Sequence, residues 1–139
     1  YLDNLILLRI KNFKEQSLKI KELKKLIEKG NFSLIVVDTI GVYYRRLVKS
    51  KKDLANNMLV SQLKNLKELS NETPVLITNQ VYSKLDVNEE LMVGHNNIER
   101  FANCLIELDK NDNRKIKLIK PVKKDMLFEI KDEGMFKVD

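Results

Sequence analysis

The sequence predicts an α/β fold in which a mainly parallel sheet lies between helices and antiparallel hairpins extend it at the C-terminus. Two observations indicate this class. Short apolar runs alternate with amphipathic stretches of helical periodicity over the first 80 residues, and this order implies parallel strands with right-handed crossovers. Pairs of short strands around turn residues replace the alternation in the last third, as in antiparallel hairpins. Without a repeat or a linker, residues 1–139 are expected to form one domain.

The chain opens with a predicted strand and a predicted helix. Residues 5–10 (LILLRI) form the apolar run of a strand. Asn12 and Glu15 have the spacing of a capping box, which predicts a helix start. The helix is expected over residues 13–29, with Gly30 as its left-handed end. Its apolar face is expected to carry Leu18, Leu23, Leu26 and Ile27.

Two further strands and a second long helix follow. Residues 34–37 are apolar without interruption, which predicts a strand covered on both faces. A second amphipathic helix is expected over residues 53–70, with an inward face of Leu59, Leu63 and Leu66. Pro74 opens a third strand (PVLITNQV), which ends in Thr78, Asn79 and Gln80. A polar loop to Gly94 and a short helix near residues 98–102 complete this part.

The last third reads as two hairpins. CLIELDKNDNRKIKLIKP predicts two strands around an Asn-Asp-Asn turn. MLFEIKDEGMFKVD predicts a second pair around Asp-Glu-Gly. The lone cysteine, Cys104, falls in a predicted strand and is expected to be buried, which suits a reducing compartment. With one cysteine and one histidine, a Cys/His zinc site cannot be assembled.

Composition narrows the classes of protein. Hydrophobic residues make up 43% and charged residues 33%, as in a globular domain rather than a disordered one. No apolar run has the length of a membrane span, and the N-terminus does not resemble a signal peptide. We therefore expect a cytoplasmic protein without a membrane partner. The net charge of +6 permits a polyanionic partner, although a general excess of lysine explains it equally well.

Two strand ends are candidates for one site. One strand ends in Asp38 and Thr39, the other in Thr78, Asn79 and Gln80. Ligands of parallel sheets bind beyond such carboxyl ends. An acid after a buried strand is the Walker B pattern, in which the carboxylate holds Mg²⁺ through water. The alternative is that the acid only caps the following helix.

The phosphate-binding loop that normally accompanies this pattern is not in the sequence. None of the four glycines lies in a G-x-x-x-x-G-K-[ST] motif, which would cradle phosphates with its backbone. The chain by itself is therefore not expected to hydrolyse ATP.

A basic stretch is the candidate nucleic-acid surface. Residues 43–52 (YYRRLVKSKK) contain five basic residues and no acid. Basic side chains neutralise phosphates, and the two tyrosines would stack on bases. The alternative is a solvated start to the next helix, with Ser50 and Asp53 at capping-box spacing. In that alternative Tyr43 and Tyr44 pack against a neighbouring helix.

Four stretches together resemble a known family. FSLIVVDTIGVYYRRL, PVLITNQVYSKLDVNEELMVGH, RFANCLIELDKNDNRKIKLIKP and FEIKDEGMFKV are similar to the second half of the archaeal RecA/RadA-type recombinases, in particular the RadB branch. The similarity runs from about residue 5 to residue 138. It implies a RecA-like core whose Walker A loop and catalytic glutamate precede the matched region. The chain would then be the C-terminal part of an ATPase core, or a shortened relative that has lost its own phosphate loop.

The resemblance implies roles for the residues at the strand ends. Asp38 corresponds to the Walker B acid that holds Mg²⁺ through water, with Thr39 beside the nucleotide. Gln80 corresponds to the catalytic glutamine that senses the γ-phosphate. His95 follows Gly94 at the end of the second DNA-facing loop and is placed near the cofactor. ATP and Mg²⁺ are implied for the intact protein only.

The resemblance also implies a DNA-facing side. The basic stretch falls in the region of the first DNA-facing loop, so the expected DNA-binding residues are Arg45, Arg46, Lys49, Lys51 and Lys52. The family has a histidine a few residues beyond the position of Gly94-His95. In this sequence Arg100 lies near the corresponding position. The second loop sets Lys84 against Asp86, Glu89 and Glu90, and its net negative charge repels phosphates. Strand exchange is therefore not expected.

The function implied is that of a RadB-like accessory protein of DNA repair and homologous recombination. It would bind single-stranded or branched DNA and ATP, with weak ATPase activity in the intact protein. A RadA-type recombinase or a structure-specific nuclease is the implied protein partner. The alternatives are a non-enzymatic interaction module on a degenerate RecA-like core, and another RecA-like ATPase of the KaiC type.

Overall fold

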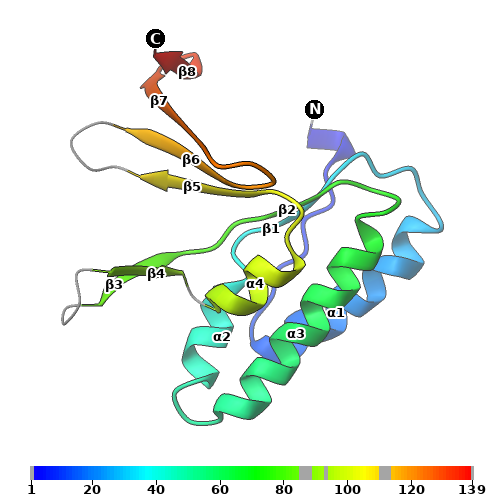
Figure 1. The fold of residues 1–139 in the computed structure, drawn as a ribbon. Helices are drawn as coiled ribbons and strands as arrows, with labels where there is room; N and C mark the ends of the chain where they lie inside the picture. Colours follow the sequence, from blue (N-terminus) through cyan, green and yellow to red (C-terminus); the bar gives the residue numbers. More distant parts are fainter. Residues whose placement is uncertain (1, 85–88, 93, 110–113, 139) are drawn as a thin grey trace. The chain divides into compact units, whose positions relative to one another are not determined.

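The computed structural model describes the backbone of residues 2–84, 89–92, 94–109 and 114–138 (Figure 1). At Leu2, residues 81–84 and residues 89–92 it describes the backbone alone. The chain divides into two compact units, Tyr1–Ile98 and Glu99–Asp139. Each unit is described by itself, and the single domain expected from the sequence stays a prediction.

The first unit holds a two-stranded parallel sheet and the long helices. Strand β1 (Ile35–Val37) pairs in parallel with β2 (Val75–Ile77), as the sequence predicted. Helices α1 (Phe13–Ile27) and α3 (Lys52–Leu69) run side by side (Figure 1). The other elements are η1 (Leu2–Asn4), α2 (Gly41–Leu47), β3 (Val81–Lys84), β4 (Glu89–Met92) and the start of α4 (His95–Phe101).

The core of this unit lies between α1, α2 and α3. The predicted inward face of α3 is confirmed, because Leu59, Leu63 and Leu66 are buried. From α1 the buried residues are Phe13, Gln16 and Ile20. The prediction for α1 is wrong at Leu18, which is 52% exposed. The buried stripe runs through Phe13, Gln16 and Ile20, and Leu18 lies outside it.

The ends of α1 show how the caps form. The Asn12 side chain accepts a hydrogen bond from the Glu15 N–H at 2.9 Å, as predicted. The Glu15 carboxylate, however, accepts from the Lys11 N–H at 2.8 Å instead of returning to Asn12. At the other end α1 stops at Ile27, and Gly30 does not adopt the predicted left-handed conformation. A Cβ at that glycine would lie 3.0 Å from the Phe32 ring, so close packing is the local reason for a glycine.

The run at residues 5–10 is not a strand, contrary to the prediction. None of the described strands pairs with it, and a strand needs such a hydrogen-bonded neighbour. Its leucines are accordingly exposed, Leu7 to 83%.

The sheet is covered on one face rather than on both. Ile35 is buried, but Val36 and Leu76, paired in register on the other face, are 53% and 52% exposed. Leu34 shares that open face, because side chains two residues apart point the same way. The prediction of a sheet between helices is thus met on one side only in the described part of the chain.

Helix α2 and the start of α3 differ from the sequence-based expectation. Residues 41–47 form a short helix that the sequence pattern does not predict. Helix α3 begins at Lys52, and its N-cap residue Lys51 makes no side-chain capping bond. Ser50 donates its hydroxyl to the Leu47 carbonyl instead, so the proposed Ser50–Asp53 capping box does not form.

The polar loop predicted after Gln80 is in part a hairpin. Strands β3 and β4 pair antiparallel, from Val81 with Met92 to Lys84 with Glu89. Asp86, one of the acids of the second DNA-facing loop inferred from the sequence, lies outside the described residues. Helix α4 then starts at His95, earlier than predicted. Gly94 before it has φ 69°, and a Cβ there would lie 2.7 Å from the Leu59 side chain.

The second unit is an antiparallel meander. Its strands β5 (Leu105–Asp109), β6 (Lys115–Lys120), β7 (Lys124–Lys131) and β8 (Gly134–Val138) pair in sequence order. Both predicted hairpins are confirmed as strand pairs, while the Asn-Asp-Asn turn lies outside the described residues. Lys117 of β6 forms ion pairs with Glu107 and Asp109 of β5, with 2.9 Å between its ammonium nitrogen and a carboxylate oxygen of each.

The parallel pair with its helices and this antiparallel meander together match the expected α/β class with an antiparallel extension. Cys104 precedes β5 and is exposed, so the prediction of a buried thiol in a strand is wrong. No helix in the described part of the chain is both long and apolar enough to cross a membrane.

Candidate functional site

The carboxyl ends of β1 and β2 meet, as the strand-end argument predicted. The Thr78 hydroxyl donates a hydrogen bond to the Asp38 carboxylate, with 2.5 Å between the oxygens. The backbone continues the ladder, since the Thr78 N–H donates to the Val37 carbonyl at 3.0 Å. The Ile40 N–H in turn donates to the Thr78 carbonyl at 3.2 Å. This end of the sheet is fixed by backbone and side-chain bonds together.

The chemistry of this end fits a hard cation held through water. Asp38 is exposed, so its carboxylate is open to a hydrated ion. Mg²⁺ prefers oxygen ligands and keeps most of its waters, so one carboxylate with a neighbouring hydroxyl is a suitable set. The Thr39 hydroxyl is buried without a hydrogen-bond partner among the described residues, which leaves a polar atom for a ligand or water. The Asp38–Thr39 peptide bond is cis.

The other residues that were predicted to contact the nucleotide lie outside β1 and β2. Gln80 is exposed and lies three residues beyond the end of β2. His95 is exposed at the first position of α4, and Arg100 in the last turn of that helix places its guanidinium 5.6 Å from the Phe101 ring. The direct contact at the strand ends joins Asp38 with Thr78, which the sequence analysis placed at the end of the other strand without a nucleotide role. The roles of Gln80 and His95 stay predictions.

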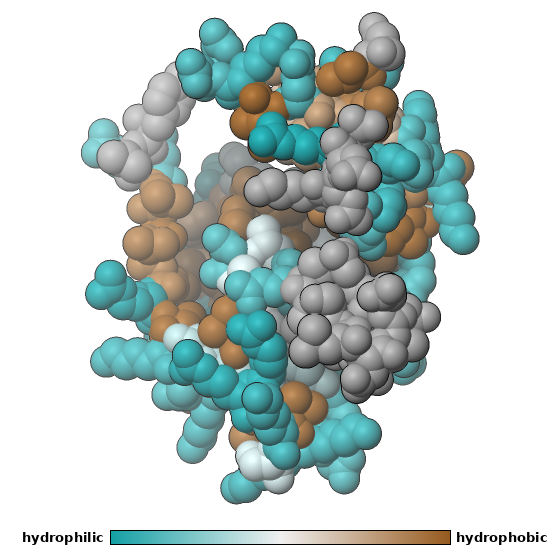
Figure 2. All heavy atoms as spheres, turned by 90° about the vertical axis from the view of Figure 1, so that its left-hand side faces the viewer, coloured by the Kyte–Doolittle hydropathy of each residue, from teal (hydrophilic) through white to brown (hydrophobic). Residues whose placement is uncertain are grey.

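A basic surface follows directly from this end. We define the basic surface as five exposed side chains: Arg45 and Arg46 on α2, Lys49 and Lys51 in the turn, and Lys52 at the start of α3. Within the described residues none of them forms an ion pair with an acid. Hydrophilic side chains accordingly extend from the lower part of the face in Figure 2, at the height of the α2–α3 turn in Figure 1.

Tyr44 of α2 packs inward against neighbouring helices, as the alternative interpretation held, whereas Tyr43 is only half-buried and bonds a residue outside any helix. Tyr44 is only 7% exposed, and its ring lies edge-on to Phe13 with 6.2 Å between the centroids. Its hydroxyl donates to the Asn56 side chain at 2.7 Å. Tyr43 donates its hydroxyl to the Ile10 carbonyl at 2.6 Å. Base stacking by Tyr44 is thus excluded by its burial in the core.

Behind the strand ends lies a buried glutamine pair that sequence reasoning missed. The Gln16 side-chain amide donates to Gln62 at 2.7 Å and to the Ile40 carbonyl at 3.2 Å. Gln62 donates in turn to the Ser17 hydroxyl at 2.7 Å. The signal was available, because both glutamines lie in phase with the apolar stripes of α1 and α3. The pair ties both helices to the segment that joins Asp38 to α2.

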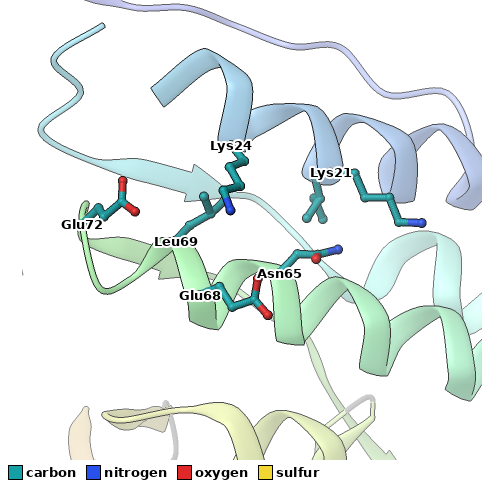
Figure 3. Close-up of a pocket in the computed structure, with 7 residues that line it drawn as sticks. Lys21, Lys24, Asn65, Glu68, Leu69 and Glu72 are labelled. Atoms are coloured by element: carbon teal, nitrogen blue, oxygen red, sulfur yellow. The ribbon is translucent and has the colours of Figure 1, made fainter. Parts of the chain in front are cut away.

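A shallow hollow between α1 and α3 is separate from the strand-end site of Asp38 and Thr78. It encloses about 190 Å³ and is lined by side chains of both signs, including Lys21, Lys24, Glu68 and Glu72 (Figure 3). Glu72 precedes β2, so the hollow lies near the start of that strand, whereas Asp38 and Thr78 lie at the carboxyl ends. Within the described residues no group of three or more His, Cys, Asp or Glu is placed to hold a metal.

Comparison with known proteins decides the family. The Rad51 family model matches residues 1–135. The chain belongs to the Rad51 family. This Rad51-family chain is 34% identical over 111 residues to the DNA repair and recombination protein RadB of Thermococcus onnurineus. It is 28% identical over 114 residues to RadB of Methanococcoides burtonii, and 36% identical over 91 residues to RadA of Ignicoccus hospitalis.

A solved structure confirms the RecA-like α/β fold. The crystal structure of the RadB recombinase superposes with a TM-score of 0.73 at 28% identity, covering 96% of this chain and 64% of that one. The Rad51-family chain covers 77–78% of its own length in the two RadB alignments. It spans only about half of those relatives, 49% and 48% of their lengths. The resemblance to the RadB branch inferred from the sequence is thus confirmed.

Proposed function

We propose that this chain is the C-terminal part of the ATPase core of a RadB-like accessory protein, and that it binds DNA through the basic surface. The observation that supports this most is the set of five exposed cations without an acidic partner among the described residues. Unpaired exposed cations bind a polyanion by releasing its counterions, without regard to base sequence. With the family resemblance, the expected ligand is single-stranded or branched DNA in the cytoplasm.

We further propose that the carboxyl ends of β1 and β2 face the nucleotide in the intact protein. Asp38 would hold the water shell of Mg²⁺, while Thr39 and His95 would lie beside ATP and Gln80 would orient water at the terminal phosphate. The ion, when bound, neutralises charge on the phosphates. The 139 residues contain no G-x-x-x-x-G-K-[ST] loop, so the phosphate cradle is not supplied by this segment. ATPase activity is expected to be weak in the intact protein and absent from the segment.

Strand exchange is not part of the proposal. The second loop contains three acids and one lysine, so this loop has a net negative charge and repels phosphates. An accessory role beside a RadA-type recombinase or a structure-specific nuclease fits such a protein better.

Salt dependence of binding to a fluorescein-labelled single-stranded oligonucleotide tests the DNA proposal. If four or five phosphates are neutralised, log K is expected to fall with log salt concentration at a slope of about −3. A peptide nucleic acid of the same base sequence is the control, because it keeps the bases and lacks the phosphates. Equal affinity for both polymers, or a flat salt response, would refute the proposal.

A non-enzymatic interaction module is the second candidate. The open apolar face formed by Leu34, Val36 and Leu76 favours it, since large exposed apolar patches often mark protein contacts. The two candidates differ in their need for nucleotide. Binding of a RadA-type recombinase that persists without ATP and after Asp38→Ala would support the module. Loss of binding in both conditions would support the nucleotide-dependent protein.

A further inference from the structure

Helix α2 is short and is held in place by its two tyrosines. Seven residues are too few for a helix that is stable alone, so tertiary contacts must fix α2. Tyr44 anchors one side of it to α3 through Asn56 and to α1 through the Phe13 ring. Tyr43 points in another direction and anchors the helix to the carbonyl of Ile10. The helix is thus fixed on two sides, and its exposed residues are Arg45 and Arg46.

Arg46 lies on the solvent side directly over Tyr43. The two residues are three apart on the helix and therefore neighbours on its surface. The Arg46 guanidinium carbon is 5.8 Å from the centroid of the Tyr43 ring, within the range of a cation–π contact. Arg46 forms no ion pair in the described part of the chain, so the ring is the contact that orients its guanidinium.

Tyr43 therefore joins a half-buried anchor at Ile10 to the exposed cation of Arg46. Its hydroxyl is only 2.6 Å from the Ile10 carbonyl oxygen, which restricts rotation of the ring. A guanidinium resting on a restricted ring loses less conformational freedom when it binds a phosphate. Lys49, Lys51 and Lys52 have no such support in the described residues, and their flexible stems lose more freedom on binding.

We propose that Tyr43 is a positioning residue of the basic surface, which presents Arg46 in advance to a phosphate of the nucleic-acid backbone. The proposal rests on the proposed DNA-binding function. Tyr43 acts through Arg46 and makes no contact with the DNA itself. This differs from the base-stacking role that its place in the sequence suggested.

A double-mutant cycle of Tyr43→Leu and Arg46→Ala tests the proposal. Affinity of the 139-residue chain for a fluorescein-labelled oligothymidylate is measured by anisotropy at fixed low salt. Tyr43→Leu is expected to weaken binding about two- to fivefold, the range of an exposed cation–π contact. In the Arg46→Ala background the same change is expected to have no further effect.

The salt slope separates positioning from a merely structural role. If one phosphate contact is lost, Arg46→Ala and Tyr43→Leu should each reduce the magnitude of the slope by about 0.7. Tyr44→Phe is the matched control, because it removes a tyrosine hydroxyl from the adjacent position of α2 without touching Arg46. This variant is expected to keep both the affinity and the slope.

Each outcome has a distinct meaning. If the wild-type chain does not bind the oligonucleotide, the proposed function fails and the inference with it. If Arg46→Ala weakens binding but Tyr43→Leu weakens it equally in both backgrounds, the inference alone is overturned.

Should Tyr43→Leu unfold the chain, Tyr43→Phe replaces it, since it removes the anchor to Ile10 and keeps the ring. If Tyr43→Phe lowers the affinity for the oligonucleotide in the wild-type chain but not in the Arg46→Ala chain, the proposal is supported. An equal loss of affinity in both backgrounds refutes it.

Discussion

Helix α1 and the basic surface carry the same number of cations in different surroundings. Helix α1 has five lysines within its fifteen residues, together with Glu15 and Glu22. Its lysines follow the helical period around the outer face, and Lys19 forms an ion pair with Glu22 at 2.7 Å. The basic surface gathers five cations into residues 45–52 with no acid among them. Its helix is held from behind by tyrosine hydroxyls.

The difference shows why net charge is a poor guide to a binding surface. Acids spaced among lysines lower the local potential, and a solvated helix face then has no preference for a polyanion. Cations without such neighbours keep their full attraction for phosphates. The contribution of α1 lies on its inner side, where Gln16 and the apolar residues pack.

Two triple variants test the comparison directly. Arg45→Ala, Arg46→Ala and Lys49→Ala together are expected to weaken oligonucleotide binding about thirty- to hundredfold, because three charge-assisted contacts to phosphate are lost. Lys14→Ala, Lys21→Ala and Lys25→Ala on α1 remove the same charge and lower the net charge of +6 equally. We expect a change of no more than about twofold for this control. Similar losses in both variants, measured by anisotropy, would contradict a localised surface.

A change on the inner side of α1 and α3 should affect stability rather than binding. Gln62→Leu leaves the buried amide of Gln16 with one partner fewer, and we expect a loss of about 2 kcal/mol in the free energy of unfolding. Urea unfolding followed by circular dichroism measures it. Asn57→Leu is the matched control, since it replaces an amide by leucine on the exposed face of α3. An equal loss in the control would remove the glutamine pair as the cause.

The ion pair of α1 should give the smallest effect. The hydrogen bond that Lys19 donates to Glu22, together with the charge of that carboxylate, raises the pKa of Lys19 above the ordinary value of 10.5. The stability that this pair contributes is therefore present below pH 10.5 and is lost as the pH rises through the raised pKa. Glu22→Gln is expected to return the pKa of Lys19 toward 10.5, as measured by NMR titration of its side chain.

The control for this titration is Glu28→Gln, which removes one acid just beyond α1 and leaves Glu22 in place. An unchanged pKa of Lys19 after Glu22→Gln would show that the pair does not persist in solution.

The long elements were predictable because their patterns are local. The period of apolar residues placed α1 and α3 to within two residues at each end, and Asn12 with Glu15 located the start of α1. The contact of Asp38 with Thr78 was foreseeable in outline, since two neighbouring parallel strands end at the same edge.

The parts that were missed depend on distant partners. Helix α2 is too short for a periodic signal, and its anchor from Tyr43 reaches back 33 residues to Ile10. The run at residues 5–10 has the composition of a strand, but composition cannot supply a neighbouring strand. Leu18 was assigned to the core because an apolar side chain was assumed to face inward, whereas the buried stripe is set by Gln16 and its bond to Gln62.

The tyrosines of α2 also give this chain an optical property. The sequence has no tryptophan and four tyrosines, and two of these four are adjacent on α2. Their phenol hydroxyls are both hydrogen-bonded, Tyr43 to a carbonyl and Tyr44 to an amide side chain, so their near-ultraviolet absorption and emission depend on those bonds. Intrinsic tyrosine fluorescence should therefore report on the helix beneath the basic surface without any attached dye.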